Sequence, residues 1–413
     1  MTTQVLELYR SAPRYLTARA VGDRLPGLVS GPLAPMRLVN RKDFEPLGPG
    51  WGRVRPLLSG ICGSDLATIS GKSSFYFSPL VSMPFVPGHE VVGELLDDVD
   101  DLPTGTRIAL RPVLSCLARG LAEPCEACAA GLTGRCDRIT TGHVSAGLQT
   151  GYCADTGGGW GKMFVAHRSQ LHPVPDELSE QRAVLIEPLS CAVHTALRAG
   201  VEPNADVVVI GAGTIGVLTL LALKELTKAG TIAVVAKHGR QREWAGAFGA
   251  TEIVDPKEAT NAIRRNTRAI KLKPERGASF LLGGADVVID CVGSRKSLNL
   301  ALRITRAGGR VVVSGIPTEG ADLTPLWFRE LELVGAYTGG YETVGSGRSG
   351  GSSGKTKERR HAFDLATDLA LANPIDGIVG ATYPLRRWRE AIDHALGAGK
   401  LGTLKVAFDP RLD

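Results

Sequence analysis

One stretch decides the fold of the second half of this chain: Val208-Val209-Ile210-Gly211-Ala212-Gly213-Thr214-Ile215-Gly216. An apolar run leads into a GxGxxG pattern and a second apolar run follows it, which predicts a strand, a tight turn and a helix. Within a βαβ unit, such a turn binds a dinucleotide. The expected cofactor-binding residues of the turn are Gly211, Gly213, Thr214, Ile215 and Gly216. Backbone N–H groups at the helix N-terminus would meet the phosphate charge.

The segments around this turn alternate between apolar strands and helices. Continuous apolar strands alternating with helices indicate a parallel sheet that is covered on both faces. We expect strands at residues 206–210, 232–235, 285–290 and 309–313, and helices at residues 187–199 and 215–228.

The first half has a different texture, rich in Gly and Pro with short apolar runs at residues 91–96 and 107–110. Short strands between turns indicate a mostly β domain. A chain of 413 residues is also too long for one typical core. We therefore predict a β-rich catalytic domain, a cofactor domain and a C-terminal segment that returns to the first domain, with boundaries at 1–186, 187–345 and 346–413.

The C-terminal third contains a run dominated by Gly and Ser, residues 339–357, which predicts an irregular loop. Residues 361–372 then have the pattern of a helix, and residues 404–408 that of a closing strand.

Composition excludes several classes of protein. With 43% hydrophobic and 22% charged residues, the chain is typical of a soluble globular protein. A net charge of +6 spread along the sequence does not favour a nucleic-acid partner. Residues 1–10 lack the apolar core of a signal peptide, and the uncharged stretch 207–223 is too short for a membrane span. Eight cysteines without an export signal indicate reduced thiols, so we expect a cytoplasmic protein without a membrane partner.

Four residues predict an open zinc site: Cys62, His89, Glu90 and Glu187. A catalytic zinc takes three protein ligands and keeps a fourth position for substrate. Thiolate, imidazole and carboxylate together suit Zn²⁺ better than Mg²⁺ or Ca²⁺. A free cysteine is more often a small buried hydrophobe, but here glycines flank both Cys62 and His89 and permit close backbone approach.

The motifs Gly60-Ile61-Cys62-Gly63-Ser64-Asp65 and Pro87-Gly88-His89-Glu90 closely resemble those of the zinc-dependent medium-chain alcohol dehydrogenases. The resemblance covers nearly the whole chain and implies an α/β protein, with a GroES-like catalytic domain and a Rossmann cofactor domain. It also implies that Glu187 is the third zinc ligand, as in the polyol, threonine and bacterial branches. Glu90 matches a glutamate that relatives use as an exchangeable ligand or as a partner of the site. Cys191, one helical turn beyond Glu187, is interpreted as a packing residue.

The resemblance implies further roles. Ser64 matches the hydroxyl residue that passes the alcohol proton outward, although a satisfied turn serine is the alternative. Some relatives carry a relay histidine five residues after the cysteine, where this chain has Ala67, so the proton must leave by another path. A homodimer or homotetramer is implied as well.

The pattern Cys125-x2-Cys128-x7-Cys136 predicts a second, structural zinc site. In relatives a fourth cysteine precedes the first by three residues, but this chain has Ala122 there. Cys116 is the favoured fourth ligand and Glu123 the competing one.

The second strand of the cofactor domain predicts the choice of cofactor. An NAD enzyme places an acidic residue at its end, to accept from the ribose 2′-hydroxyl. Ala236 occupies that position, and the cations Lys237, His238 and Arg240 follow. This favours NADP(H) over NAD(H), unless the three are ordinary surface cations.

Zinc and a nicotinamide cofactor together predict hydride transfer between NADP(H) and an alcohol, aldehyde or ketone. The alternatives are an NAD(H)-dependent polyol or amino-alcohol dehydrogenase, or a reductase of activated C=C or C=N bonds. A nucleotide-sensing or nucleic-acid-binding protein on the same fold is disfavoured, because a binder needs no open metal position. The aromatic residues 75–77 and Trp160 favour an apolar substrate weakly, since core packing explains them equally well.

Overall fold

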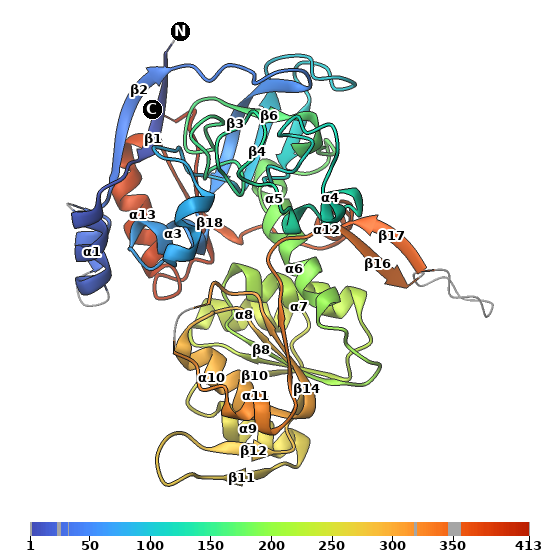
Figure 1. Ribbon diagram of the computed structural model, residues 1–413. Helices are drawn as coiled ribbons and strands as arrows, with labels where there is room; N and C mark the ends of the chain where they lie inside the picture. The colour runs from blue at the N-terminus through green and yellow to red at the C-terminus, as the bar shows by residue number, and fades with distance from the viewer. Residues whose placement is uncertain (1, 23–25, 32, 318–319, 346–356, 413) are drawn as a thin grey trace. The chain divides into compact units, whose positions relative to one another are not determined.

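The computed structural model describes residues 2–22, 26–31, 33–317, 320–345 and 357–412. The chain forms two compact units (Figure 1), the first comprising residues 1–187 and 367–413 and the second residues 188–366. The expected combination of a mostly β unit with a doubly wound parallel-sheet unit is confirmed. No helix in the described part of the chain combines the length and apolar composition that a membrane span requires.

A seven-stranded sheet forms the first unit, with strand order β18-β19-β3-β4-β5-β7 and β6 paired to β3. Its last strand, β19, lies antiparallel to β3, with Ala407 opposite Gly60. The end of the chain therefore lies beside the residues that precede Cys62. The strands of this unit are β1 (Thr2–Leu8), β2 (Met36–Lys42), β3 (Trp51–Gly60), β4 (Val91–Leu95), β5 (Arg107–Leu110), β6 (Phe164–His167), β7 (Leu171–Pro173), β18 (Val379–Tyr383) and β19 (Lys405–Phe408).

Helices of the first unit are mostly short. Strands β1 and β2 pair with each other, and the connection between them carries α1 and α2. The α-helices are α1 (Ala12–Val21), α2 (Pro26–Val29), α3 (Gly63–Ile69), α4 (Glu126–Ala129), α5 (Glu180–Ala183), α12 (Ala362–Ala372), which begins in the second unit, and α13 (Trp388–Gly397). The 3-10 helices are η1 (Phe75–Leu80), η2 (Thr133–Arg135), η3 (Arg168–Gln170) and η4 (Leu385–Arg387).

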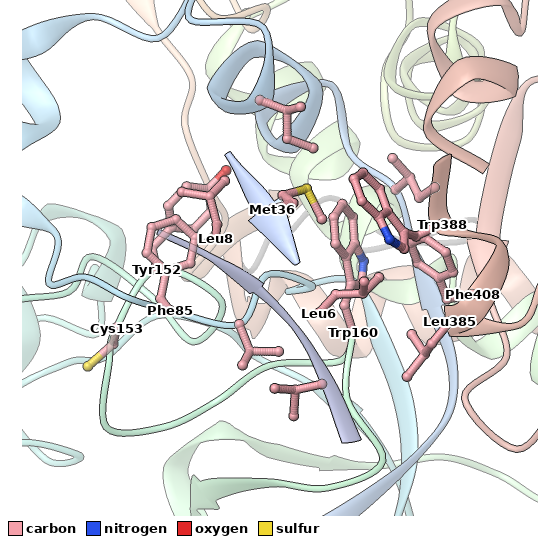
Figure 2. Close-up of a cluster of buried hydrophobic side chains, with 14 of the residues drawn as sticks. Leu6, Leu8, Met36, Phe85, Tyr152, Cys153, Trp160, Leu385, Trp388 and Phe408 are labelled. Carbon is pink, nitrogen blue, oxygen red and sulfur yellow. The ribbon is translucent and has the colours of Figure 1, made fainter. Parts of the chain in front are cut away.

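The main core of this unit joins residues from both ends of the chain (Figure 2). Trp160 is fully buried, packs edge-on against Phe408 with ring centroids 5.0 Å apart, and donates from Nε1 to the Gly60 carbonyl at 3.3 Å. Of the two roles that the sequence allows for Trp160, core packing is therefore the one that the structure has. Phe75 and Tyr76 are exposed.

The second unit is built on a six-stranded sheet with strand order β10-β9-β8-β13-β14-β15, in which every neighbouring pair is parallel. Val207, Val208, Val209 and Ile210 of β8 are all buried although successive side chains point to opposite faces. Both faces of the sheet are therefore covered, as expected. The sheet strands are β8 (Asp206–Ile210), β9 (Thr231–Val235), β10 (Glu252–Val254), β13 (Ala285–Asp290), β14 (Thr305–Val313) and β15 (Glu332–Gly335).

Five helices follow or connect these strands, and two hairpins lie outside the sheet. The helices are α7 (Thr214–Leu226), α8 (Gly239–Ala247), α9 (Ala259–Thr267), α10 (Arg295–Ile304) and α11 (Thr324–Phe328). Helix α6 (Ile186–Arg198) leads into the unit. The hairpins pair β11 (Ile270–Leu272) with β12 (Phe280–Leu282), and β16 (Tyr341–Gly345) with β17 (Lys357–His361).

The second hairpin corrects a prediction. Residues 339–357 are expected as an irregular loop, but residues 341–345 form a strand that pairs with 357–361, and residues 346–356 lie outside the described residues. Tyr341, Thr343 and Val344 supply the β propensity that the neighbouring glycines mask in the sequence. Oε1 of Glu342 accepts a hydrogen bond from Nδ1 of His194 on α6 at 2.6 Å, which fixes β16 to that helix.

Candidate active site and metal centres

Cys62 lies where β3 ends and α3 begins. It is the residue before the first turn of α3, with φ −85° and ψ 155°, and its backbone N–H donates to Oδ2 of Asp65 at 3.0 Å. A Cβ on Gly60, two residues earlier, would collide with the carboxylate of Glu90. The glycine is therefore required for the two segments to meet.

His89 is buried beside Cys62. Gly88 before it has φ +99°, a conformation that L side chains avoid, and a Cβ there would also press on Trp160. One potential ligand atom from each of Cys62, His89 and Glu90 lies within 4.8 Å of the others. The structure thus brings together residues that are far apart in the sequence in a cluster of metal-ligand size.

The electrostatics of this cluster favour a cation. Burial lowers the pKa of His89, but the negative charges of Asp65, Cys62 and Glu187 outweigh burial and raise the pKa well above its ordinary value. A set of groups that holds a proton this firmly is also suited to a divalent cation, which takes the place of that proton. Donor chemistry and charge therefore both fit zinc.

Glu90 already has a cationic partner, which the sequence does not predict. Lys405 of β19 donates to Oε1 and Oε2 of Glu90 at 2.7 and 2.5 Å, and to the Ile61 carbonyl at 3.2 Å. Burial lowers the pKa of Lys405, but Glu90 and Cys62 raise it further, so the net shift is upward and the ammonium stays charged. Lys405 gives no motif signal, because it lies more than 300 residues from the glutamate that it binds.

Glu187 is buried near the start of α6. It does not belong to the cluster of ligand atoms within 4.8 Å, as far as the described residues go. Its charge nevertheless raises the pKa values of both His89 and Lys405, so it acts on the same site. Cys191 on the same helix lies 3.9 Å from the Thr338 hydroxyl, measured from Sγ to Oγ1.

Ser64 has a hydroxyl without a partner. Its Oγ is buried and makes no hydrogen bond to any described residue. A buried hydroxyl left unpaired costs about 1–3 kcal/mol, so this atom is free to bind an incoming polar group. The position fits the expected role of Ser64 toward an alcohol.

Asp65 and Tyr152 support the imidazole and were missed by the sequence analysis. Oδ1 of Asp65 lies 3.6 Å from Nδ1 of His89 and accepts from the Tyr152 hydroxyl at 3.3 Å. The rings of Tyr152 and His89 have centroids 5.9 Å apart. Asp65 could have been found from its place three residues after Cys62, whereas Tyr152 carries no comparable signal.

The cysteine lobe comprises residues 116–136. The sulfurs of Cys116, Cys125, Cys128 and Cys136 all lie within 4.8 Å of one another, and three of the four cysteines are buried. Cys116 joins the set even though the sequence separates it from the others, and Glu123 is not among these atoms. Four thiolates in a closed, buried arrangement fit a structural zinc.

One buried arginine holds the connection that follows this lobe. Arg119 is fully buried and donates to the carbonyls of five residues, at distances from 2.6 to 3.3 Å: Leu114, Thr141, Val144, Ser145 and Gly147. Burial lowers its pKa, although neighbouring thiols and Asp155 oppose this effect. Arg119 also has no motif signal in the sequence.

The glycines of the dinucleotide turn differ in the space around them. Gly211 has φ +94°, and a Cβ there would collide with Val292. A Cβ on Gly216 would collide with the Gly211 carbonyl, whereas one on Gly213 would meet nothing within 4 Å. The open position is the one expected to approach a pyrophosphate, and Thr214 and Ile215 follow it in the first turn of α7.

The cations after β9 are not equivalent. Lys237 is exposed and His238 is half-buried. Arg240 forms an ion pair with Glu243 at 2.9 Å and lies over the ring of Trp244, 5.3 Å from its centroid. Arg242 donates to the Ala236 carbonyl at 3.2 Å and so holds the end of the strand.

Asp290, at the end of β13, has its oxygens occupied within the protein. Oδ1 accepts from the backbone N–H groups of Val292 and Gly293 at 2.9 and 3.1 Å, and Oδ2 from the Ser297 hydroxyl at 3.0 Å. Burial raises its pKa, opposed by these hydrogen bonds. Its role is to hold the turn before α10.

Sequence comparisons place both units among known dehydrogenases. Residues 48–176 match the alcohol dehydrogenase GroES-like domain, and residues 214–346 the zinc-binding dehydrogenase family. L-idonate 5-dehydrogenase of Vitis vinifera is 32% identical over 297 residues, which are 70% of this chain and 74% of that protein. Sorbitol dehydrogenase of Arabidopsis thaliana is 31% identical over 300 residues, with the same two shares.

Solved structures share the fold. A zinc-binding dehydrogenase of Sinorhizobium meliloti, solved bound to NADP, superposes with a TM-score of 0.71 at 24% identity, covering 99% of this chain and 100% of that one. L-idonate 5-dehydrogenase of Escherichia coli superposes with a TM-score of 0.66 at 22% identity, covering 99% and 98%. Together with the sequence matches, these findings show that the chain belongs to the zinc-dependent medium-chain dehydrogenase family, oxidoreductases that act on CH–OH groups.

Proposed function

We propose that this protein interconverts a small polyol or other hydroxylated substrate and its carbonyl form, with NADP(H) as the hydride carrier. The observation that carries the proposal is the cluster of Cys62, His89 and Glu90 beside the unpaired hydroxyl of Ser64. Buried ligand groups next to a buried hydroxyl with free hydrogen-bonding capacity suit a zinc site that admits an alcohol oxygen.

The zinc ligands in this proposal are Cys62, His89 and Glu187. Glu90 is the less suitable third ligand, because both of its oxygens accept from Lys405. Lys405 neutralises the charge of Glu90, which weakens its oxygens as ligands for a cation. In this proposal, Glu90 and Lys405 together set the charge of the site and do not coordinate the metal.

In this proposal, each residue of the site has its own role in alcohol oxidation. Zinc held by these residues would supply a Lewis acid for the substrate oxygen. Ser64 accepts the proton of the substrate hydroxyl, and Asp65 orients His89. A bound nicotinamide would supply the hydride acceptor, and the backbone of Gly213 would leave room for its pyrophosphate.

Three features support NADP(H) over NAD(H). Ala236 has no carboxylate to accept from a ribose 2′-hydroxyl, and Lys237 and His238 can face a 2′-phosphate. Arg240 contributes less, because Glu243 already neutralises it. We expect kcat/KM to be at least about tenfold higher with NADP⁺ than with NAD⁺, since one charge-assisted contact is worth about 1.5–3 kcal/mol.

We infer the substrate class from the relatives and from the buried position of Trp160. Trp160 belongs to the core, which weakens the argument for an apolar substrate. The similar proteins from Vitis vinifera and Arabidopsis thaliana are named for idonate and sorbitol, both polyhydroxylated. A polyhydroxylated substrate is therefore favoured over a simple aliphatic alcohol.

A substrate panel tests the proposal. The purified protein is assayed with sorbitol, xylitol, L-idonate, 2,3-butanediol and 2-propanol at the nicotinamide absorbance, with NADP⁺ and with NAD⁺, before and after chelation. We expect NADPH formation with at least one polyhydroxylated substrate, and its loss after chelation. Chelation-resistant activity would contradict the zinc assignment, and equal use of both cofactors would contradict the cofactor assignment.

The variant Ala236→Asp tests the cofactor assignment separately. A carboxylate at the end of β9 would repel a 2′-phosphate and accept from a 2′-hydroxyl, so the preference should shift toward NAD⁺ by about 10- to 100-fold. Ala236→Asn is the matched control, since it has nearly the shape of Ala236→Asp without the charge. An unchanged preference in Ala236→Asp would contradict the assignment.

A further inference from the structure

The net charge of this chain is concentrated on one short segment, although the sequence leads us to expect an even spread. Residues 264–276 hold six cations and one acid, a net charge of +5, whereas the whole chain of 413 residues has +6. The six cations are all exposed: Arg264, Arg265, Arg268, Lys271, Lys273 and Arg276. The helix dipole favours cations at the end of α9, which accounts for the three arginines there but not for the three cations of the β11–β12 hairpin.

These cations have no carboxylate that neutralises them. None of the six forms an ion pair with any residue that the structure describes, and Lys271 donates to a neutral acceptor, Oδ1 of Asn261, at 2.7 Å. Two arginines of the neighbouring strand β14 are paired by contrast, Arg306 with Asp286 at 2.5 Å and Arg310 with Glu332 at 2.6 Å. The positive charge of the segment is therefore not balanced within the described part of the chain.

One face of the hairpin is apolar and open to solvent. Ile270 lies opposite Leu282, and Leu272 lies opposite Phe280. Opposite residues of an antiparallel pair share a face, as do alternate residues of one strand, so these four side chains lie together. Ile270 is 63% exposed, Leu272 and Leu282 are each 40% exposed, and Phe280 is half-buried. Leu281 points the other way and is fully buried in the core of the second unit, so the apolar face is turned away from that core.

The hairpin has a fixed place at the margin of the second unit (Figure 1). Arg268 closes α9 in the left-handed conformation, with φ +53°, and the chain then enters β11. Nη1 of Arg303, on α10, donates to the Ala278 carbonyl in the connection between the two strands, at 3.2 Å. Both strands contact α9, so the cations at the end of this helix lie next to the apolar face. Residues 264–282 are called the basic hairpin below.

Charge and exposed apolar side chains together decide between possible partners. A second copy of this chain is disfavoured at this face, because two surfaces of like charge repel each other. A nucleic acid would meet the cations but leave the aliphatic side chains in water, and the aromatic ring of the face, Phe280, is half-buried and poorly placed for base stacking. A bilayer with anionic phospholipids satisfies both features, because its headgroups attract Lys and Arg and its acyl boundary takes up apolar side chains.

We propose that the basic hairpin is a peripheral docking surface for a membrane that contains anionic phospholipids. The cations attract the protein to the charged bilayer, and the side chains of Ile270, Leu272 and Leu282 enter the headgroup region. This proposal replaces the expectation of a protein without a membrane partner. It does not depend on the proposed hydride transfer, because none of these residues belongs to the Cys62 site or to the dinucleotide turn.

Vesicle binding by the full chain tests the proposal. Purified protein is mixed with phosphatidylcholine vesicles that contain either no anionic lipid or a substantial fraction of phosphatidylserine, and the bound fraction is measured by flotation at low and at high salt. At low salt we expect binding at least about tenfold tighter with phosphatidylserine than without it. Most of this binding should be lost at high salt, because a shorter Debye length screens the attraction.

A charge variant and an apolar variant separate the two contributions. The triple variant Lys271→Gln, Lys273→Gln, Arg276→Gln should weaken vesicle binding by about 100-fold, since each cation near an anionic surface is worth about fivefold. The double variant Ile270→Thr, Leu282→Thr keeps β-forming residues in a cross-strand pair and should weaken binding by about tenfold.

The matched control removes the same charge elsewhere. Lys228, Arg386 and Lys400 are exposed cations outside the basic hairpin, and their combined replacement by Gln should leave vesicle binding within about threefold of the wild type. The melting temperature of each variant checks that it is folded. Lys273→Gln and Arg276→Gln alone, both outside the two strands, should each cost about fivefold and provide the same test should the triple variant be unstable.

Three results would overturn the proposal: equal binding to vesicles with and without phosphatidylserine, an equal loss in the charge variant and the matched control, or vesicle binding at the wild-type level in Ile270→Thr, Leu282→Thr. Poly-L-glutamate and duplex DNA are measured at the same salt concentration. Tighter binding to either of them than to the anionic vesicles would assign this surface to an acidic protein or to a nucleic acid instead.

Discussion

The cysteine lobe and the Cys62 site place thiols in opposite settings. In the lobe, the metal-ligand atoms are four sulfurs, mostly buried, with backbone N–H groups of Cys125 and Arg138 each 3.4 Å from one of them. At the Cys62 site, a single half-buried thiol stands with an imidazole, carboxylates and an unpaired hydroxyl. A closed sulfur set can only hold a metal, whereas the mixed set leaves hydrogen-bonding capacity for a substrate.

Charge balance separates the two sites further. Around Cys62 the negative groups meet one buried ammonium, that of Lys405, and raise the pKa of His89. In the lobe, burial and the neighbouring Cys116 raise the pKa of Cys136, and the opposing hydrogen bonds from the Arg138 N–H and the Cys128 thiol only partly offset this. We therefore expect the lobe to contribute order and the Cys62 site to contribute reactivity, a distinction that variants can test.

The largest effect is expected for Cys62→Ala. Loss of this thiolate should remove the catalytic metal and lower kcat/KM by about 1,000-fold or more, because several kcal/mol of Lewis-acid stabilisation disappear. Steady-state kinetics and zinc content check this, with Cys191→Ala as the matched thiol control. Cys136→Ala should instead lower the melting temperature. Equal changes of the melting temperature in Cys62→Ala and Cys136→Ala would contradict the different roles of the two sites.

Lys405→Met comes next and probes the charge balance of the Cys62 site. It leaves Glu90 buried without its cation, which should lower the free energy of unfolding by about 3–5 kcal/mol. Denaturant unfolding measures this loss. Adding Glu90→Gln to the same chain should recover much of it, and a double variant as unstable as the single one would show that Lys405 acts through packing alone.

Arg119→Met tests the order next to the lobe. Removing the guanidinium leaves five carbonyls without their shared donor, which should cost about 3 kcal/mol of unfolding free energy, since part of this backbone can rehydrate. We expect faster proteolysis within residues 114–147 and nearly unchanged KM. A large fall in kcat with no thermal effect would contradict the assignment of order to this region.

The smallest effect concerns the rate at which metal leaves each site. A chelator such as 1,10-phenanthroline should remove the Cys62 metal at least about tenfold faster than the lobe metal, because a three-ligand site keeps an open position for the chelator. Activity should be lost with the first equivalent of zinc released, while the second is released only after thiol modification. Release of both metals at the same rate would contradict the distinction between the open Cys62 site and the closed lobe.

Several elements could be predicted from residues alone. The GxGxxG turn and the apolar strands around it predict the parallel sheet, since a run buried on both faces has few other structures. Of the glycines near Cys62 and His89, Gly60 and Gly88 lie where only glycine fits, whereas a Cβ on Gly63 would meet nothing within 4 Å. The strand at residues 341–345 was missed, because neighbouring glycines conceal its β-forming residues.

By itself the sequence determined the two-unit architecture, the dinucleotide turn and the ligand types, because local propensity, periodicity and motif spacing are read along the chain. Only the tertiary structure decided that Lys405 binds Glu90 and that Cys116 joins the other sulfurs. Such contacts depend on how distant segments pack, and packing energy depends on three-dimensional proximity, which the order of residues does not encode locally.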